Sequence, residues 1–347
     1  MINLLVTTAG GSGIYSVIEA VKESKYKDQI KLTLVDANEI AGALYEVDNS
    51  YIIPTVNNEN FFCVLKKIIK KEKINFMLSL LDEELIFLAD KINELALLGV
   101  KTLIPKKSSL LNSWNKINTF KICKNFMPKT YILEKDIDLD KVWKELNGEI
   151  LLKPAMNRGG RGIIIPEDLE ELKFFANKFL KKSIPYLIQK LIKGKEYNIT
   201  SLHTDKGELV YAIARWKFEK RLIKSGSKAS IIENNKDVVE FALNVLKRMD
   251  LCYGFNNVEV IESEDGIFLL EVNAGRIAAQ DMNILKANVN FIDLFIDIMN
   301  NTPFKKPEVK YGVCNIKTSR DIWVEYHQID KKLKEYNENI DSCSTSG

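Results

Sequence analysis

Two carboxylates and an amide in the last third of the sequence have the spacing of a metal site. Glu271 and Asn273 lie two residues apart in a stretch that predicts a β-strand, so their side chains point to one face. If residues 257–261 and 267–272 pair as a hairpin, Glu259 joins that face from the neighbouring strand. Carboxylate and amide oxygens suit Mg²⁺, which bridges phosphates. A solvated sheet face is the alternative interpretation.

A lysine followed by glycines offers a second kind of chemistry. Lys153 ends a predicted strand, and the loop after it contains Gly159, Gly160 and Gly162. An ammonium group can contact a phosphate while backbone amides of such a loop approach the same oxygens. We expect residues 154–162 to be mobile until a nucleotide binds. An exposed surface loop without a ligand would have the same composition.

The segment after the next predicted strand could bind a base and a sugar. The backbone around Gln189, Lys190, Leu191 and Ile192 could hydrogen-bond an adenine edge, and the carboxylate of Glu196 could hold ribose hydroxyls. In isolation this is equally an ordinary strand and turn.

The glycine turn Gly10-Gly11-Ser12-Gly13 follows the first predicted strand, where a dinucleotide-binding fold has its phosphate loop. Asp36 lies at a plausible distance downstream, but Ser16 stands where the third glycine of that motif would be. A tight strand-to-helix turn in a scaffold domain is the favoured interpretation. A nicotinamide site is the alternative.

Two kinds of sheet must position these residues. In the first third, short apolar runs alternate with helical patterns, which predicts a mostly parallel, doubly wound sheet. A helix is expected over 113–126. Later segments alternate in hydrophobicity and are joined by the turns 205–207 and 264–266, which predicts antiparallel hairpins. The polar segment 219–230 is interpreted either as a charged surface loop or as part of the site that binds the acceptor substrate.

In this order along the chain, the motifs resemble those of ATP-grasp enzymes of the carbamoyl-phosphate-synthase-like branch. Asn115-Lys116 is similar to the Asp-Lys pair that opens the family's nucleotide region. The resemblance covers residues 1 to about 300 and implies a Rossmann-like domain followed by a two-lobed ATP-grasp fold, in an α/β and α+β architecture. The expected divisions are an N-terminal domain at 1–112, a small lobe with the lid at 113–192, a large lobe with the metal site at 193–310, and a C-terminal extension at 311–347.

The resemblance also implies roles for single residues. Lys116, Lys153 and the glycines of the closing loop, or lid, at 154–162 would contact phosphates. Gln189–Ile192 would contact adenine and Glu196 the ribose. Glu259, Glu271 and Asn273 would bind the metal. Arg276 matches the arginine that contacts the transferred phosphoryl group, although Gly275 is an extra residue before it. Arg215 and Lys217 would line the acceptor side. The implied reaction activates a carboxylate as an acyl phosphate for attack by an amine, with ATP and Mg²⁺ (or Mn²⁺) as cofactors.

Composition narrows the classes of partner. The 347 residues carry 50 Lys and Arg against 47 Asp and Glu, a net charge of +3, which argues against a nucleic-acid-binding protein. No stretch has the length of a membrane span, and no secretory signal is expected, so a cytoplasmic enzyme is predicted. Small-molecule carboxylates and amines are the expected partners, and assembly as a homodimer is left open. The five scattered cysteines predict free thiols rather than a disulfide framework or a zinc site.

Two other functions are compatible with the sequence. A nicotinamide-dependent dehydrogenase would use the glycine turn and Asp36, but would leave the Glu259, Glu271 and Asn273 set unexplained. A non-catalytic nucleotide-binding protein on the same fold would retain ATP without turnover.

Overall fold

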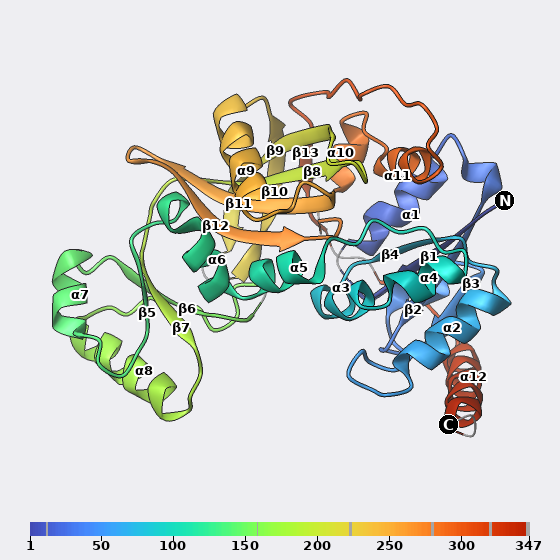
Figure 1. Ribbon diagram of the computed structural model, residues 1–347, viewed down its shortest axis with the longest axis horizontal. Coiled ribbons are helices and arrows are strands. Elements are labelled where there is room, and N and C mark those ends of the chain that lie inside the picture. Colours follow the sequence, from blue (N-terminus) through green and yellow to red (C-terminus); the bar gives the residue numbers. More distant parts are fainter. Residues whose placement is uncertain (12, 158, 222–223, 279–280, 319–320, 345–347) are drawn as a thin grey trace.

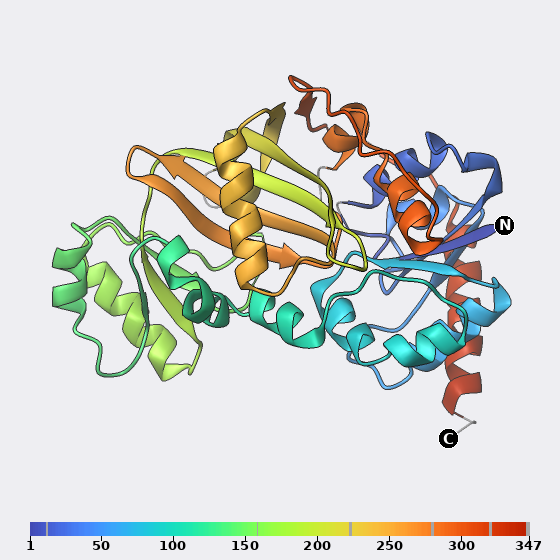
Figure 2. The same cartoon turned by 45° about the horizontal axis from the view of Figure 1, so that its top comes forward.

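The computed structural model describes residues 1–11, 13–157, 159–221, 224–278, 281–318 and 321–344. Figure 1 shows three sheets along the long axis of the molecule, and Figure 2 shows the same order from a second direction. The largest sheet lies between an N-terminal α/β domain and a small lobe at the opposite end.

The N-terminal domain is built on a parallel four-stranded sheet with the order β3-β2-β1-β4, which confirms the predicted doubly wound arrangement. Its strands are β1 (Ile2–Thr7), β2 (Ile30–Asp36), β3 (Asn49–Ile52) and β4 (Phe76–Ser79). Its helices are α1 (Ile14–Lys22), α2 (Phe61–Lys71), α3 (Asp82–Ala89) and α4 (Ile92–Leu97). Beside β4, Lys101 forms an isolated bridge with Phe76.

Two short helices connect this domain to the rest of the chain. The continuous helix predicted over 113–126 is wrong, because α5 (Lys107–Trp114) ends before Asn115 and α6 (Lys116–Cys123) begins after it. The side chain of Asn115 accepts a hydrogen bond from the N–H of Ile117 at 2.9 Å and so caps α6. The cap places Lys116 in the first turn of the new helix.

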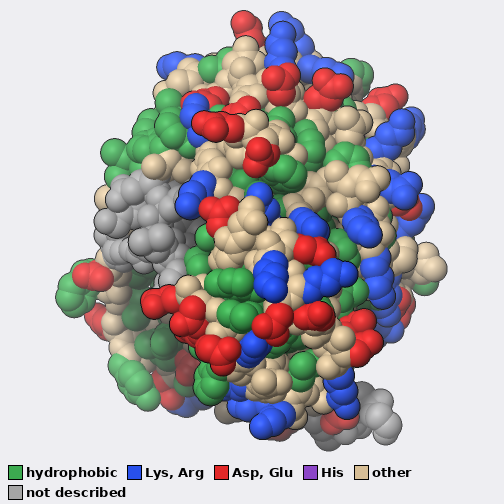
Figure 3. All heavy atoms as spheres, turned by 90° about the vertical axis from the view of Figure 1, so that its left-hand side faces the viewer, with side chains coloured by type: hydrophobic (Ala, Val, Ile, Leu, Met, Phe, Trp, Pro, Cys, Tyr) green, Lys and Arg blue, Asp and Glu red, His purple; other side chains and the backbone are tan. Residues whose placement is uncertain are grey.

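The small lobe has a hydrophobic core of its own. Its antiparallel sheet has the order β5-β7-β6, and helices α7 and α8 lie together on one side of it. The elements are β5 (Thr130–Ile132), α7 (Leu139–Glu145), β6 (Ile150–Pro154), α8 (Leu169–Lys181) and β7 (Tyr186–Lys190). Leu146, Ile150, Leu152 and Leu172 are fully buried in a cluster drawn from this lobe alone. On the end face of the molecule, basic and acidic side chains are interspersed (Figure 3).

The large sheet is antiparallel, with the strand order β12-β11-β8-β9-β10-β13. Its strands are β8 (Lys195–His203), β9 (Leu209–Arg221), β10 (Lys224–Glu233), β11 (Gly254–Ser263), β12 (Gly266–Ala274) and β13 (Cys314–Ile316). Helices α9 (Lys236–Arg248), α10 (Met282–Lys286) and α11 (Phe291–Met299) accompany it. Phe295 of α11 packs edge-to-face against Phe76 and also contacts Phe255, so one core joins this sheet to the N-terminal domain.

Both predicted hairpins are present, as β8–β9 and β11–β12. The interpretation of 219–230 as a loop is wrong where the structure describes it, since β9 continues to Arg221 and β10 begins at Lys224. A polar composition did not prevent pairing because the two strands continue an established antiparallel ladder.

The C-terminal segment returns to the first domain through α12 (Tyr326–Ser344), which lies against β3 and α2 (Figure 1). A disulfide joins Cys63 of α2 to Cys343 of α12, so the expectation that all five cysteines are free is wrong for this pair. The two positions are 280 residues apart, and only the fold brings them together. None of the described helices is both long and apolar enough to cross a membrane.

Candidate active site

The β11–β12 hairpin brings the three predicted metal-binding residues onto neighbouring strands. Glu259 pairs directly with Glu271, and Asn257 pairs with Asn273. The Glu259 and Glu271 side chains are about one-fifth exposed, which places both at the edge of the buried sheet face. Within the described residues, no group of three or more His, Cys, Asp or Glu could hold a metal ion. Magnesium is commonly held by one or two carboxylates, so a site here would draw on Glu259 and Glu271, with the amide oxygen of Asn273 as a further candidate ligand.

Two buried lysines approach this hairpin. Lys116 Nζ lies 3.4 Å from Glu271 Oε1 and donates a hydrogen bond to the carbonyl oxygen of Asn157 at 2.7 Å. Lys153 Nζ donates to the carbonyl oxygen of Leu270 at 2.6 Å. Both lysines are less than a tenth exposed, at the point where the small lobe meets the large sheet. The structure thus brings together two ammonium groups that the sequence separates by 37 residues.

Burial and neighbouring charges shift the pKa values of Glu271 and Lys153 in this cluster. Burial opposes the charge of Glu271, but Lys116, Lys153 and Arg276 together hold the pKa of its carboxyl below the ordinary value. Burial lowers the pKa of Lys153 to about 8, and Glu271 only partly offsets this effect. The direct partner of Lys153 is a neutral carbonyl, so its charge would be better stabilised by an anion.

This pKa predicts how MgATP binding depends on pH. Below about pH 8 Lys153 is charged, whereas above it binding of a phosphate would require uptake of a proton. We expect the affinity to be level near pH 7 and to fall by up to about tenfold per pH unit above pH 8. Calorimetry in buffers of different ionisation enthalpy should detect the proton uptake. A pH-independent affinity from 7 to 9.5 would contradict it.

A third buried lysine joins two predicted site residues. Lys217 Nζ lies 2.7 Å from Glu196 Oε1 and 2.9 Å from Glu259 Oε2. Although burial opposes the charge, Glu259 and Glu196 hold the pKa of Lys217 above its ordinary value. Arg215 lies two residues earlier on the same face of β9 and is also buried. Burial lowers the pKa of its guanidinium, and the negative charges of Asp281 and Glu259 oppose this shift. Because Arg215 and Lys217 lie two residues apart on one strand, both cations share one face of β9.

Arg276 is held by one residue of the N-terminal domain and one residue of β12. Its Nε donates to Asp82 Oδ1 at 2.9 Å, and its Nη2 donates to Asn273 Oδ1 at 2.7 Å. The extra residue Gly275 has a φ of 78°, a conformation that favours glycine, and this turn returns Arg276 to Asn273. Asp82 begins α3 of the N-terminal domain, and no sequence motif pointed to it.

The predicted lid is a turn-rich loop between β6 and α8. Gly159, Gly160 and Gly162 all have positive φ values, between 65° and 73°. The hydroxyl of Tyr186 donates to the carbonyl oxygen of Gly162 at 3.1 Å, and Lys116 contacts the other end of the loop at Asn157. Arg158 lies outside the described residues.

Hydrogen exchange should show whether this loop responds to nucleotide. Within 154–162, the amides after Ala155 should exchange quickly in the free protein, because few apolar side chains anchor that part of the segment, whereas the buried N–H of Ala155 donates to the carbonyl oxygen of Pro185. Addition of MgATP should slow them, while amides of α8 on the same lobe serve as the internal reference. Equal exchange of the loop with and without MgATP would remove the lid interpretation.

The predicted adenine-binding segment leaves the small sheet and leads into β8. Gln189 is buried, and its Nε2 donates to Thr130 Oγ1 at 2.9 Å, so this side chain is engaged inside the lobe. The N–H groups of Lys190 and Leu191 donate to the carbonyls of Lys129 and Glu149. No hydrogen bond of the Ile192 N–H is found within the described part of the chain.

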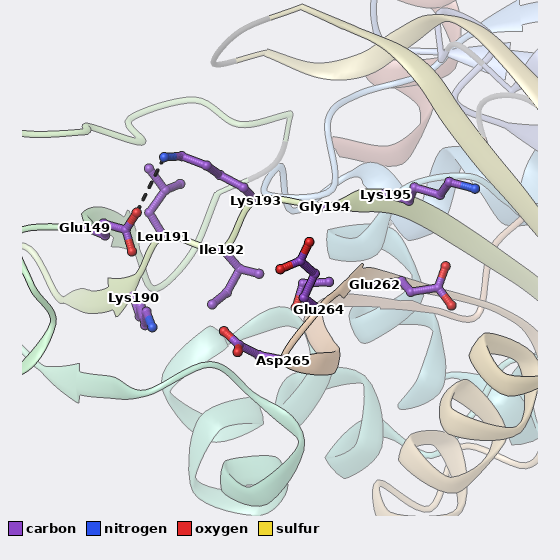
Figure 4. A pocket seen from close by; sticks show the side chains of 11 residues that line it. Glu149, Lys190, Leu191, Ile192, Lys193, Gly194, Lys195, Glu262, Glu264 and Asp265 are labelled. Carbon is purple, nitrogen blue, oxygen red and sulfur yellow. Dashed lines mark hydrogen bonds and ion pairs between the residues drawn. The ribbon is translucent and has the colours of Figure 1, made fainter.

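A pocket of about 730 Å³ opens beside this segment (Figure 4). The connection 190–195 forms one wall, and the tip of the β11–β12 hairpin, including Glu262, Glu264 and Asp265, faces it. The described lining includes Lys190, Leu191 and Ile192 but none of the buried lysines. This pocket therefore lies beside the predicted adenine-binding segment and not at the buried lysine cluster.

The glycine turn of the N-terminal domain uses its aspartate internally. Asp36 Oδ2 accepts a hydrogen bond from the N–H of Gly10 at 2.6 Å, and Oδ1 accepts one from the N–H of Asn38. A Cβ on Gly10 would lie 3.2 Å from this carboxylate. The geometry favours the scaffold turn over a ribose-binding aspartate, with Ser12 outside the described residues.

The chain is similar to known proteins in both sequence and structure. Residues 114–280 match the family described as ATP-grasp domain, and residues 4–103 match the PylC-like N-terminal domain. The carbamoyl phosphate synthase large chain of Clostridium botulinum is 29% identical over 138 residues, 38% of this chain but 13% of that protein. The tetrahydromethanopterin:alpha-L-glutamate ligase of Methanocaldococcus jannaschii is 32% identical over 156 residues, 42% of this chain and 52% of that protein. This chain thus spans only part of both relatives.

A solved structure shares the fold over most of the chain. The biotin carboxylase domain dimer of the Hydrogenobacter thermophilus 2-oxoglutarate carboxylase, solved with MgADP, ADP and bicarbonate, superposes with a TM-score of 0.66. The match covers 89% of this chain and 72% of that chain at 18% identity.

Proposed function

This chain belongs to the ATP-grasp family through residues 114–280, and from that membership we propose that it is a ligase that joins a carboxylate to an amine at the expense of ATP. The observation that carries the proposal is the buried cluster at the lobe junction. Lys116 and Lys153 converge there on a hairpin that presents Glu259, Glu271 and Asn273.

The residues of this cluster fit magnesium and a nucleotide. Two carboxylates and an amide oxygen are a donor set suited to magnesium. Lys153 has a neutral carbonyl as its direct partner, and a phosphate would supply the missing counter-charge. The nearby cations Lys217, Arg215 and Arg276 suit a reaction in which anionic oxygens meet.

In the proposed mechanism the protein positions the reactants and neutralises charge. Glu259, Glu271 and Asn273 would hold the magnesium, which would supply charge stabilisation at the phosphate oxygens. Lys116 and Lys153 would hold phosphate oxygens from the small lobe. Arg276, fixed by Asp82 and Asn273, would face the transferred group, and Arg215 would face the acceptor. Gln189–Ile192 and Glu196 remain the proposed adenine and ribose contacts.

The proposal extends to the cofactors, the location and the assembly of the protein. ATP with Mg²⁺ is the proposed nucleotide, which agrees with the MgADP bound in the biotin carboxylase structure. A cytoplasmic location is proposed from the sequence. That biotin carboxylase domain is described as a dimer, which supports a homodimer here as a proposal.

The direct experiment is a screen for phosphate release with MgATP and pooled carboxylates and amines. The expected result is release that requires one carboxylate and one amine together. Tight ATP binding without turnover in any pool would favour the non-catalytic protein. Binding of NADH in preference to ATP, measured by fluorescence titration, would favour the dehydrogenase.

A further inference from the structure

The turn that carries Arg276 is packed against helices α3 and α5. A Cβ on Gly275 would lie 3.0 Å from Pro105 Cδ. It would lie 3.2 Å from the side chains of Leu85 in α3 and Leu110 in α5. The extra residue before Arg276 therefore occupies a close-fitting site on these helices, which together with its φ of 78° favours glycine there.

The glycine turn of the N-terminal domain holds the same segment from another side. A Cβ on Gly13 would lie 3.3 Å from the carbonyl oxygen of Ala278 and 3.7 Å from that of Ile277. Both of these residues are buried. The glycine at the start of α1 therefore leaves space for the backbone that follows Arg276.

Asp82 supplies the negative charge at this turn. Among the described residues, it is the carboxylate that pairs directly with Arg276, and the two side chains are 10% and 18% exposed. Burial opposes the charge of Arg276, but Asp82 holds the pKa of its guanidinium above the ordinary value, with help from Glu271 and Glu259. The pair is shielded from the solvent that weakens exposed ion pairs.

The first turn of α3 is itself fixed to the parallel sheet. Glu84, two residues after Asp82, accepts a hydrogen bond from Ser79 Oγ at 2.8 Å and another from Thr7 Oγ1. Thr7 ends β1 and Ser79 ends β4, and all these side chains are buried. Asp82 therefore approaches Arg276 from a rigid support at the carboxyl ends of two neighbouring strands.

Asn273 is the other partner of Arg276, but its amide oxygen is also a proposed metal ligand. A metal ion on that oxygen would repel the guanidinium, so Asp82 is the partner that would continue to hold it. The guanidinium has five N–H donors, and the bonds to Asp82 and Asn273 use two of them. The others can donate to an oxyanion.

We propose that Asp82 is a positioning residue, which orients Arg276 from the N-terminal domain toward the phosphoryl group during transfer. The inference rests on the proposed function and adds to it a role for the N-terminal domain in the reaction. Asp82 acts through Arg276, so its loss should weaken binding of the reacting state and leave nucleotide binding unchanged.

The test compares two complexes by calorimetry, MgADP alone and MgADP with aluminium fluoride, which mimics a phosphoryl group during transfer. The parent protein should bind the aluminium fluoride complex at least about tenfold more tightly than MgADP. Asp82→Asn keeps the shape of the side chain and one acceptor oxygen. It should bind MgADP within about twofold of the parent but lose about tenfold in affinity for the aluminium fluoride complex.

Asp90→Asn is the matched control. It removes an exposed carboxylate at the other end of α3, one that pairs with Lys107, and should change neither affinity. Binding of the aluminium fluoride complex no tighter than MgADP by the parent, or equally tight by Asp82→Asn and the parent, would overturn the inference alone. A parent that does not bind MgADP would overturn the proposed function with it.

A double variant tests whether Asp82 acts through Arg276. Arg276→Met alone should lose the tighter binding of the aluminium fluoride complex, and the addition of Asp82→Asn should cause no further loss. A further loss of about tenfold would show that Asp82 acts independently and would overturn the inference. If Asp82→Asn does not fold, Asp82→Glu replaces it, because this variant keeps the charge but displaces it by one methylene. Asp82→Glu should show the same selective loss, and parent-like affinity for both complexes would contradict the positioning role.

Discussion

Glu271→Gln should abolish phosphate release while the protein melts within a few degrees of the parent. The side chain keeps its shape, and the directly paired Glu259 loses a like-charged neighbour, so the fold should persist. Loss of one carboxylate ligand should nevertheless reduce turnover by at least about 10³-fold at millimolar magnesium, because the metal supplies several kcal/mol of charge stabilisation. Thermal melting and ATP turnover with an active substrate pair are the measurements.

Glu240→Gln is the matched control for this experiment. Glu240 is an exposed residue of α9, so its replacement changes the net charge equally without touching the cluster or the pocket. A Glu271→Gln protein that melts normally and turns over at the parent rate would refute the metal assignment. A variant that unfolds would instead identify Glu271 as structural.

Lys153→Met should weaken MgATP binding by about 2–3 kcal/mol, the scale of a charge-assisted hydrogen bond. This corresponds to a roughly 30- to 150-fold increase in the calorimetric Kd. Since the lysine is buried with a depressed pKa, methionine should not destabilise the free protein, and the melting temperature should hold or rise.

The control for this variant is Lys121→Met, which removes an exposed lysine from α6. It should bind MgATP as the parent does. An unchanged affinity in Lys153→Met would remove Lys153 from the nucleotide site.

The parts of the site that the sequence predicted are those set by local periodicity. Glu259, Glu271 and Asn273 follow from strand alternation and one hairpin turn, and the structure pairs them as expected. Arg215 and Lys217 are likewise two residues apart on one strand. In each case short-range geometry alone decides which side chains share a face.

The parts that the sequence could not predict depend on long-range packing. Asp82 reaches Arg276 from the N-terminal domain, 194 residues away, and Asp281 reaches Thr200 across 81 residues. No motif marks such pairs, because nothing in their local sequence differs from an ordinary capping or loop aspartate. The disulfide between Cys63 and Cys343 escaped prediction for the same reason.

That disulfide closes most of the polypeptide into a covalent ring. Both nucleotide-binding lobes lie inside it, because only residues 1–62 and 344–347 fall outside the two cysteines. A protease that cuts the glycine loop at 159–162 would therefore leave two fragments still attached to each other. Such a nicked protein should migrate as one species under denaturing conditions until a thiol reductant separates the pieces.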